Sequence, residues 1–275
     1  MSESCFILGC GKMGSALLQG WLTAGTSPRH YIIIDPFFDK DSALVADARV
    51  SVYADCASAA AAGHHTADIM LLSVKPQMMA EALAAASALD VSSCCFISIA
   101  AGLSLAQLAS LIPHATAPAI IRTMPNTPAA IGKGMTALIG NEAATPAQMA
   151  MAEEMLAVSG RVVRLADEAE MDTVTALSGS GPAYLFLMAE AMTEAGTALG
   201  LSPEMAATLA QQTILGAAHL MTDSDDAPAT LRENVTSKGG TTAAALAVLQ
   251  ADDGLTDLMT RAMQAAYDRS RSLGS

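Results

Sequence analysis

The chain has 275 residues, enough for one large domain or two smaller ones with a substantial core. Hydrophobic residues make up 52% of it and charged residues 15%, a balance that argues against a disordered chain. The formal net charge is −13 and no basic stripe is present, which argues against nucleic acid or an anionic membrane surface as a partner.

The longest stretch without a formal charge runs from Val91 to Ile121 and raises the question of a membrane span. Gly102, Pro113 and Pro118 interrupt it, whereas a transmembrane helix needs about 20 continuous apolar residues. We expect instead a buried strand, a turn, a short helix and a second strand. Glu3 and the lack of a basic region before the first apolar run predict that there is no signal peptide.

The five cysteines all lie in the first hundred residues and form no C-x-x-C motif. Their odd number and their spacing indicate a reducing, cytoplasmic compartment. The adjacent Cys94 and Cys95 leave a redox switch open, although two thiols buried in a strand are the simpler interpretation. His64 and His65 have no further ligands at metal-binding spacing, so no metal site is predicted.

The first half of the chain alternates short apolar runs with helical patterns. The runs are CFIL (5–8), YIII (31–34), IMLLSV (69–74), CFISI (95–99) and AIIRTM (119–124). Continuous apolar strands separated by helices are typical of a parallel sheet that is covered on both faces. Shorter runs at 135–139 and 161–165 are expected to extend the sheet at one edge.

The strand pattern stops after about residue 165, and helical patterns follow. Pro182 and the pair Ser202-Pro203 each mark the start of a helix, while SDDAPAT (224–230) is a polar break. We therefore predict an α/β domain with a mainly parallel sheet over residues 1–165 and an all-α domain over 166–275. The second domain is rich in Ala and Met and more apolar than a monomeric bundle needs, which predicts an oligomer interface.

The segment ILGCGKMG places Gly9, Gly11 and Gly14 after the first predicted strand and at the start of a helix. In such a loop the first glycine allows a tight turn, the second admits a pyrophosphate and the third lets helix and strand pack closely. Asp35 ends the second predicted strand, where a carboxylate accepts hydrogen bonds from a ribose hydroxyl and repels a 2′-phosphate. These features predict a dinucleotide site that favours NADH, with a cap of the next turn as the alternative role for Asp35.

Three more loops follow strands on the edge where open parallel sheets bind ligands. Lys75 offers a charge, Ala100 and Ala101 leave room for a nicotinamide, and Asn126 is held between two prolines, although ordinary loop chemistry is an alternative for each. The cofactor-binding residues that we predict are Gly9, Cys10, Gly11, Lys12, Met13, Gly14, Asp35, Ser73, Val74, Lys75, Pro76, Ile99, Ala100, Ala101, Pro125 and Asn126.

Together these motifs resemble those of the pyrroline-5-carboxylate reductases, which catalyse the last step of proline biosynthesis. MPNTP (124–128), LSGSGPAY (177–184) and NVTSKGGTT (234–242) are not generic to dinucleotide folds, and the resemblance covers essentially the whole chain. It implies a Rossmann domain, a helical domain for dimerisation and substrate binding, and reduction of 1-pyrroline-5-carboxylate to L-proline with NADH or, often, NADPH. It also implies a homodimer of interleaved helices, and dimers of this family often associate into decamers.

The resemblance assigns roles to particular residues as well. It makes Thr242 the catalytic residue, and it implies substrate binding by Glu168, Asp225, Asn234, Gly239 and Gly240. The neighbouring hydroxyls of Ser237 and Thr241 are further donors that we predict to bind the substrate. Two positions depart from the family pattern: Lys238 stands where proline is frequent, and Asp35 replaces the small or polar residue common in members that prefer NADPH.

The segment SKGGTT also fits a substrate carboxylate on physical grounds. Its glycines expose backbone N–H groups, and the following helix adds the partial positive charge of its N-terminus. A Thr N-cap after a flexible turn is the alternative. Two rival functions stay open: a reductase or dehydrogenase for a hydroxy acid or another imine, and a non-catalytic nucleotide-sensing scaffold. Hydroxy-acid enzymes of this plan usually carry a lysine in the first helix of the second domain, and SGSGPAYLFLMAE (178–190) has none.

Overall fold

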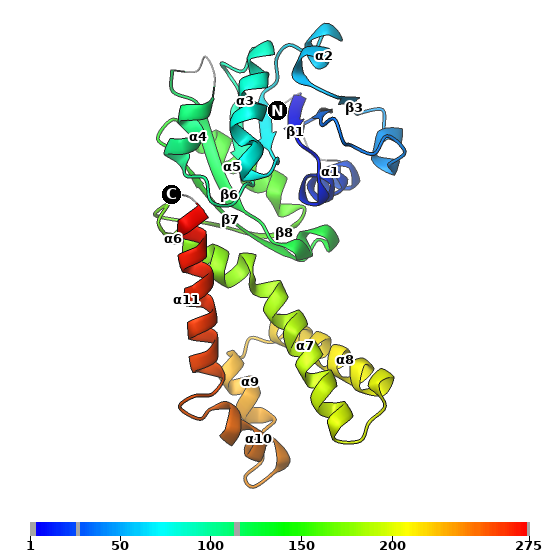
Figure 1. The fold of residues 1–275 in the computed structure, drawn as a ribbon, viewed down its shortest axis with the longest axis vertical. Coiled ribbons are helices and arrows are strands. Elements are labelled where there is room, and N and C mark those ends of the chain that lie inside the picture. The colour runs from blue at the N-terminus through cyan, green and yellow to red at the C-terminus, as the bar shows by residue number, and fades with distance from the viewer. Residues whose placement is uncertain (1–3, 26–27, 113–115, 274–275) are drawn as a thin grey trace. The chain divides into compact units, whose positions relative to one another are not determined.

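A computed structural model describes residues 4–25, 28–112 and 116–273 of the chain. It divides into a first unit of residues 1–179 with 267–275, and a second unit of residues 180–266 (Figure 1). The first unit contains an eight-stranded sheet. Its strands are β1 (Ser4–Leu8), β2 (His30–Ile34), β3 (Val50–Tyr53), β4 (Ile69–Leu72), β5 (Cys95–Ser98), β6 (Ala119–Met124), β7 (Gly134–Gly140) and β8 (Gly160–Arg164).

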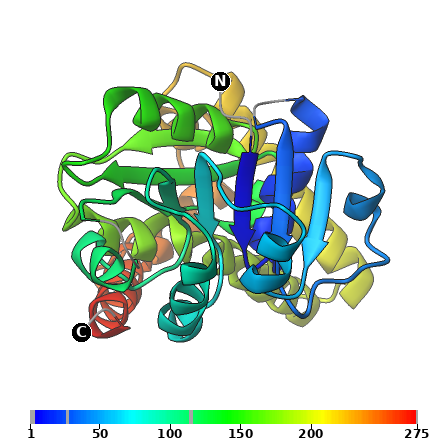
Figure 2. The ribbon, with the colours of Figure 1, turned by 90° about the horizontal axis from the view of Figure 1, so that it is seen from above.

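The strand order in the sheet is β3-β2-β1-β4-β5-β6-β7-β8, and Figure 2 shows the strands side by side with β1 in dark blue. All neighbouring pairs are parallel except β6 and β7, which run antiparallel. The order reverses between β1 and β4, which is the point where doubly wound sheets bind their ligands. The predicted mainly parallel sheet, with extra strands at one edge, is confirmed.

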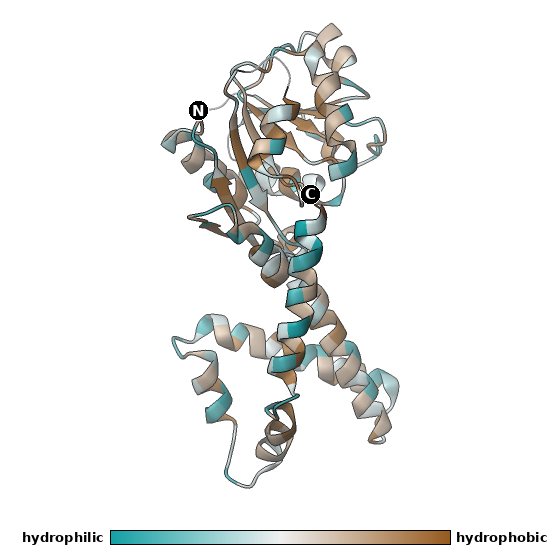
Figure 3. Ribbon diagram, turned by 60° about the vertical axis from the view of Figure 1, so that its left-hand side comes forward, coloured by the Kyte–Doolittle hydropathy of each residue, from teal (hydrophilic) through white to brown (hydrophobic). Residues whose placement is uncertain are grey.

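Side chains of the strands β1 to β6 alternate between two apolar cores, one on each face of the sheet. In β1, Phe6 and Leu8 face one core, whereas Cys5 and Ile7 face the other. The first core is covered by α2 (Cys56–Ala61), α3 (Met79–Ala85) and α4 (Leu105–Leu111), and the second by α1 (Lys12–Ala24) and α5 (Pro146–Ala157). Each fully buried aliphatic side chain contributes roughly 1.5–3 kcal/mol, so burial on both faces explains why the strands are continuously apolar (Figure 3).

Trp21 links the two helices that cover the second core. Its indole N–H donates a hydrogen bond to the carbonyl of Met155 at 2.7 Å. Its ring stacks on Tyr31 of β2, with centroids 5.6 Å apart and planes 10° from parallel. A large aromatic side chain with its one polar group satisfied can therefore be fully buried here.

The adjacent Cys94 and Cys95, at the start of β5, are free thiols and form no disulfide. Cys94 belongs to the first core and Cys95 to the second, so their side chains point to opposite faces of the sheet. Burial raises the pKa of Cys94 to about 11 and that of Cys95 to about 12. Thiols with such pKa values are almost fully protonated near neutral pH, which makes them poor redox centres. The structure therefore supports the simpler interpretation of two buried thiols.

Within the described parts of the chain, β3 is the one strand that the apolar pattern does not predict. It lies at the sheet edge, and only Val50 of its four residues is fully buried. A short, half-exposed edge strand needs no continuous apolar run. By contrast, the uncharged stretch from residue 91 to 121 contains β5, a turn at Gly102 with φ +81°, α4 and the beginning of β6, as expected.

The second unit is helical, as predicted. Its helices are α7 (Gly181–Ala198), α8 (Pro203–Asp223), α9 (Pro228–Asn234), α10 (Thr241–Leu249) and the greater part of α11 (Leu255–Leu273). The hydroxyl of Ser202 caps α8 by accepting a hydrogen bond from the Met205 N–H at 3.2 Å. Among the described residues, no helix combines the length and the apolar character needed to cross a membrane.

The division by contacts differs from the boundary expected at residue 165. The second unit begins at Ser180, because the segment before it, including α6 (Glu170–Val174), is tied to the sheet unit. The end of α11 also belongs to the first unit, where the Ser270 hydroxyl donates to Asp172 at 2.6 Å. The functional division into residues 1–165 and 166–275 stays a prediction.

Candidate cofactor and substrate sites

The three glycines of the first loop meet three different local demands. Gly9 has φ +80°, and a Cβ there would lie 2.7 Å from the Val74 side chain. A Cβ on Gly14 would lie 2.9 Å from the Ser73 hydroxyl, so the start of α1 approaches the end of β4 closely. Nothing lies within 4 Å of the Cβ position of Gly11. The loop therefore packs tightly against the protein at Gly9 and Gly14, whereas at Gly11 there is space for a ligand.

The Asp35 carboxylate serves two backbone groups at the end of β2. Its Oδ2 accepts a hydrogen bond from the Cys10 N–H at 2.8 Å, and its Oδ1 accepts one from the Phe37 N–H at 2.9 Å. The residue thus caps its own turn and also ties that turn to the glycine loop. Because a carboxylate has about four acceptor sites, both oxygens can still accept from a ribose.

A cavity of about 500 Å³ opens beside this carboxylate in the first unit. Six of the predicted cofactor residues line it: Gly9, Gly11, Asp35, Ser73, Val74 and Lys75. Sequence reasoning missed other lining residues, notably Phe37, Ala54, Asp55, Cys56 and Glu81. Ala54 and Asp55 directly follow β3, so recognising that strand would have been the signal for them. Lys75 is the one cation among the lining residues, against three carboxylates.

The other predicted cofactor residues lie outside this cavity. Lys12 is exposed in the first turn of α1, whereas the thiol of Cys10 is buried and its pKa is raised to about 11 by that burial. The methyl group of Ala100 packs into the first core. Met13, Pro76, Ile99 and Ala101 are half-buried, and Pro125 is buried.

Both polar atoms of the Asn126 amide are hydrogen-bonded within the protein. Its Oδ1 accepts a hydrogen bond from the Met135 N–H at 2.9 Å, and its Nδ2 donates to the Ser178 carbonyl at 3.0 Å. Ser178 lies in a π-helical turn over Thr175–Gly179. Asn126 therefore joins the end of β6 to β7 and to the turn that precedes α7, rather than extending free toward a ligand.

Glu168 is likewise engaged within the first unit. Its Oε1 accepts hydrogen bonds from Arg122 Nη1 at 2.7 Å and from the Leu105 N–H at 2.8 Å. The Arg122 side chain is only 8% exposed, whereas that of Glu168 is 29% exposed. The ion pair thus connects β6, the start of α4 and the segment before α6.

In the second unit, the GG-x-T segment forms an uncapped helix start. Gly239 has φ +72°, and Gly240 is the N-cap of α10 with no side-chain capping bond. The first helical hydrogen bond runs from the Ala244 N–H to the Gly240 carbonyl at 3.2 Å. The N–H groups of Thr241 and Thr242 therefore precede the hydrogen-bonded turns and are available to an anion. The alternative of a Thr N-cap does not match this geometry.

The remaining predicted substrate residues also belong to the second unit. Asn234 is the exposed last residue of α9, and Asp225 is exposed in the loop between α8 and α9. Ser237 accepts a backbone hydrogen bond from the Gly240 N–H at 3.0 Å, which closes the turn that leads into α10. Thr241 is exposed and Thr242 is half-buried.

Comparison with known proteins identifies relatives along the full chain. Residues 168–273 match the model of pyrroline-5-carboxylate reductase dimerisation, and residues 4–102 match that of NADP oxidoreductase, coenzyme F420-dependent. The pyrroline-5-carboxylate reductase of Haemophilus influenzae is 42% identical over 267 residues, which cover 97% of this chain and 96% of that protein. The chain belongs to the pyrroline-5-carboxylate reductase family.

Solved structures of this family have the same fold. The pyrroline-5-carboxylate reductase of Coxiella burnetii superposes with a TM-score of 0.88 at 33% identity, covering 100% of this chain and 99% of that one. The Plasmodium falciparum pyrroline carboxylate reductase, solved with NADP bound, has a TM-score of 0.82 at 28% identity, with 100% and 98% coverage.

The contrast between Gly9 and Gly11 gives a test of the roles proposed for the glycine loop. Gly9→Ala is expected to lower the free energy of unfolding by about 2 kcal/mol or more, because the new Cβ combines a left-handed backbone with a clash. The backbone at Gly11 is extended and its Cβ position faces open space, so Gly11→Ala should leave the melting temperature unchanged. The added methyl group would occupy the space proposed for the pyrophosphate, so the affinity for NADH should fall about tenfold. Thermal melting and cofactor titration of both variants measure this. Equal stability of the two variants would contradict the steric argument.

Proposed function

We propose that this protein reduces 1-pyrroline-5-carboxylate to L-proline with a reduced nicotinamide dinucleotide. The observation that carries the proposal is the open glycine loop beside the 500 Å³ cavity, in a chain of this family. The residues fit such a cofactor, because Gly11 leaves space for a pyrophosphate and Asp35 offers acceptors to a ribose. When bound, the reduced nicotinamide supplies a hydride to the C=N carbon of the imine ring, which becomes C5 of proline.

The second unit supplies the substrate contacts in this proposal. The N–H groups of Thr241 and Thr242 hold the substrate carboxylate, because the Gly240 N–H is already bonded to the Ser237 carbonyl. The partial positive charge at the start of α10 also favours the carboxylate. Ser237 precedes the same segment, Asn234 ends α9 and Asp225 lies in the loop before α9, and in this proposal the three side chains orient the ring. The Thr242 hydroxyl hydrogen-bonds the ring nitrogen, and it either donates the proton that this nitrogen gains or orders a water molecule that donates it. Because an iminium is already electrophilic, no metal ion or strong acid is needed.

An absorbance assay of cofactor oxidation tests the proposal directly. The purified chain, supplied with NADH or NADPH, should oxidise the cofactor only when the cyclic imine is present. Reduction of another imine in this assay, or oxidation of a hydroxy acid when NAD⁺ is supplied instead, would favour the rival reductase or dehydrogenase, although α7 contains no lysine at the position those enzymes use. Cofactor binding without turnover of any of these substrates would favour a nucleotide-sensing scaffold.

We propose further that NADH is used at least as well as NADPH. Asp35, Asp55 and Glu81 line the cavity, and Lys75 is the one cation among its lining residues, so a 2′-phosphate would meet an unfavourable field. Both Asp35 oxygens are held by backbone N–H groups, which fixes the carboxylate at the cavity.

Asp35→Ser is therefore expected to shift the ratio of kcat/KM values toward NADPH by about tenfold, which corresponds to about 1.4 kcal/mol. The measurement is kcat/KM with both cofactors for both proteins. Asp39→Ser, on the following turn and outside the cavity lining, is the matched control and should leave the ratio unchanged. An unaltered ratio in Asp35→Ser would remove this carboxylate from cofactor selection.

In this proposal the chain forms a homodimer through its second unit, and such dimers can associate further into a decamer. Large apolar side chains exposed along α7, α8 and α10 support it, among them Phe186, Leu209 and Val248. We also propose a cytoplasmic location, because Cys5, Cys10, Cys56, Cys94 and Cys95 are all buried free thiols.

A further inference from the structure

We propose that Glu168 is a positioning residue that holds the loop between β5 and α4, and through it the nicotinamide half of the cofactor site. The family resemblance assigns Glu168 to the substrate, but its geometry points elsewhere. Both hydrogen bonds of its Oε1 are made within the first unit, to Arg122 and to the backbone of Leu105. This inference rests on the proposed function, because it takes residues 99–101 to flank the nicotinamide.

The loop is fixed at its first end by buried hydrogen bonds. The Thr123 hydroxyl donates to the Ser98 carbonyl at 2.9 Å, and the Ala100 N–H donates to the Ser98 hydroxyl at 3.3 Å. Ser98 and Thr123 are both buried, so these bonds are shielded from water. The chain then turns at Gly102, where a Cβ would lie 3.1 Å from the Cβ of Leu273.

At its second end the loop enters α4 through a capping box. The Ser104 hydroxyl accepts from the Gln107 N–H at 3.2 Å, and the Gln107 side chain accepts from the Ser104 N–H at 2.8 Å. The Leu105 N–H is a further first-turn donor that the helix itself cannot satisfy. Glu168 accepts from it, and its negative charge is favoured at a helix N-terminus. The carboxylate thus completes the anchoring of residues 99–104.

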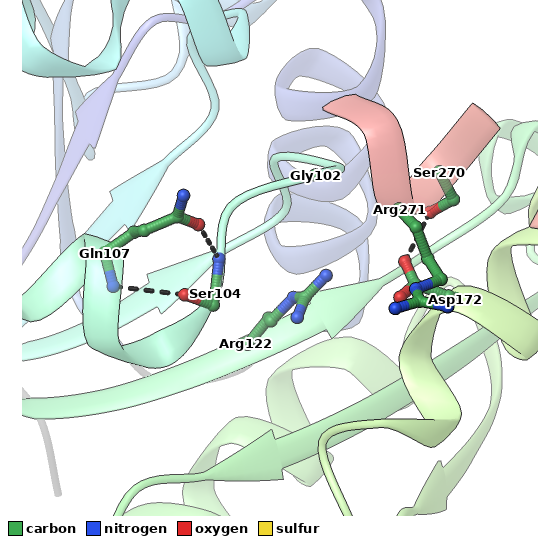
Figure 4. A pocket seen from close by; sticks show the side chains of 7 residues that line it. All are labelled: Gly102, Ser104, Gln107, Arg122, Asp172, Ser270 and Arg271. Atoms are coloured by element: carbon green, nitrogen blue, oxygen red, sulfur yellow. Dashed lines mark hydrogen bonds between the residues drawn. The ribbon is translucent and has the colours of Figure 1, made fainter. Parts of the chain in front are cut away.

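Arg122 fixes the position of the Glu168 carboxylate. The Arg122 side chain is almost completely buried, and its guanidinium holds Glu168 in place through a charge-assisted hydrogen bond. On its other side lies a polar cavity of about 140 Å³, into which Arg122 points between Ser104 and Asp172 (Figure 4). If Glu168 were replaced by a shorter residue, water could enter beside Arg122 and the Arg122 side chain could move. The Leu105 N–H at the start of α4 would then lose its carboxylate acceptor.

A loosened loop would affect one half of the cofactor only. Residues 99–101 are predicted to lie against the nicotinamide, whereas Asp35 and the glycine loop serve the adenosine and pyrophosphate. A misplacement of about 1 Å at the reacting ring can cost a hundredfold in rate. Binding of ADP-ribose, which lacks the nicotinamide, should therefore not depend on Glu168.

The test compares NADH and ADP-ribose binding by titration in the full chain. Glu168→Ala should weaken NADH binding about tenfold and leave ADP-ribose binding within about twofold, since a bond to a charged group is lost at one end of the site. With saturating NADH, kcat should fall while KM for the imine stays nearly constant. Glu168→Gln should restore most of the affinity, because its amide oxygen can still accept from Leu105. Asp172→Ala, a carboxylate lining the same cavity that bonds Ser270 and not α4, is the matched control and should bind both ligands normally.

Three results would overturn parts of this scheme, and they are distinguishable. Unchanged NADH binding with a raised KM for the imine in Glu168→Ala would make Glu168 a substrate ligand. An equal loss of NADH and ADP-ribose affinity, with a lower melting temperature, would reduce it to a general structural role. Failure of the wild-type chain to bind either NADH or ADP-ribose would overturn the proposed function itself.

Discussion

Replacement of Thr242 by valine is expected to lower kcat for the cyclic imine by about 10- to 100-fold. Valine keeps the shape of threonine and removes only the hydroxyl that we propose to bond the ring nitrogen. A general acid or base contributes typically about 10²–10⁴-fold, whereas a hydroxyl that only orients the ring contributes about 10-fold, or about 1.4 kcal/mol. We expect a value between about 10 and 100 because a threonine hydroxyl is a weak acid that water can replace. The backbone N–H groups at the start of α10 remain, so the substrate carboxylate should still bind and KM should change little.

Steady-state kinetics beside a direct NADH titration measures this effect. Cofactor affinity should be unaltered, because the cavity and the glycine loop belong to the first unit. Thr260→Val is the matched control: Thr260 is exposed on α11 and its hydroxyl bonds only the Thr256 carbonyl of its own helix, at 2.8 Å. Wild-type kcat and KM in Thr242→Val would mean that this segment is only a helix start, and the proton donor would have to be sought elsewhere.

Phe186→Asp is expected to weaken the proposed dimer by at least about 100-fold. Leu185, Phe186 and Leu187 are consecutive in α7, and each is more than half exposed in the single chain. Consecutive helix positions point in different directions, so α7 is apolar around much of its circumference, which is typical of a helix buried in an assembly. A carboxylate placed in such an interface without a partner costs several kcal/mol, and each 1.4 kcal/mol is a tenfold change in the dissociation constant.

Light scattering over a range of protein concentrations gives the oligomeric state. The wild-type chain should remain dimeric or larger on dilution, and Phe186→Asp should become monomeric with its helical content retained. Ile131→Asp introduces the same charge at an apolar side chain that is 76% exposed in the first unit, and it should leave the oligomer intact. A dimer of unchanged strength in Phe186→Asp would exclude this face of α7 from the interface.

The sequence by itself determined the elements whose signals are local. Runs such as CFIL predict buried strands because a strand covered on both faces must be apolar at every position. Pro182 and Ser202 mark helix starts because a first-turn proline and a capping hydroxyl act within one turn. The glycine loop could be recognised for the same reason, since its conformational demands lie within six residues.

Only the tertiary structure decided which groups meet. Glu168 and Arg122 are 46 residues apart, and Asn126 and Ser178 are 52 apart, so no periodicity or local motif predicts these partners. Asp35 shows both levels at once: its place at the end of β2 followed from the sequence, whereas its bond to the Cys10 N–H depends on the packing of β2 beside β1. Local patterns reflect backbone preferences and burial, but the partner of a polar side chain is set by segments that folding brings together. For that reason the conformation of the glycine loop was predictable, and the hydrogen bonds that anchor residues 99–104 were not.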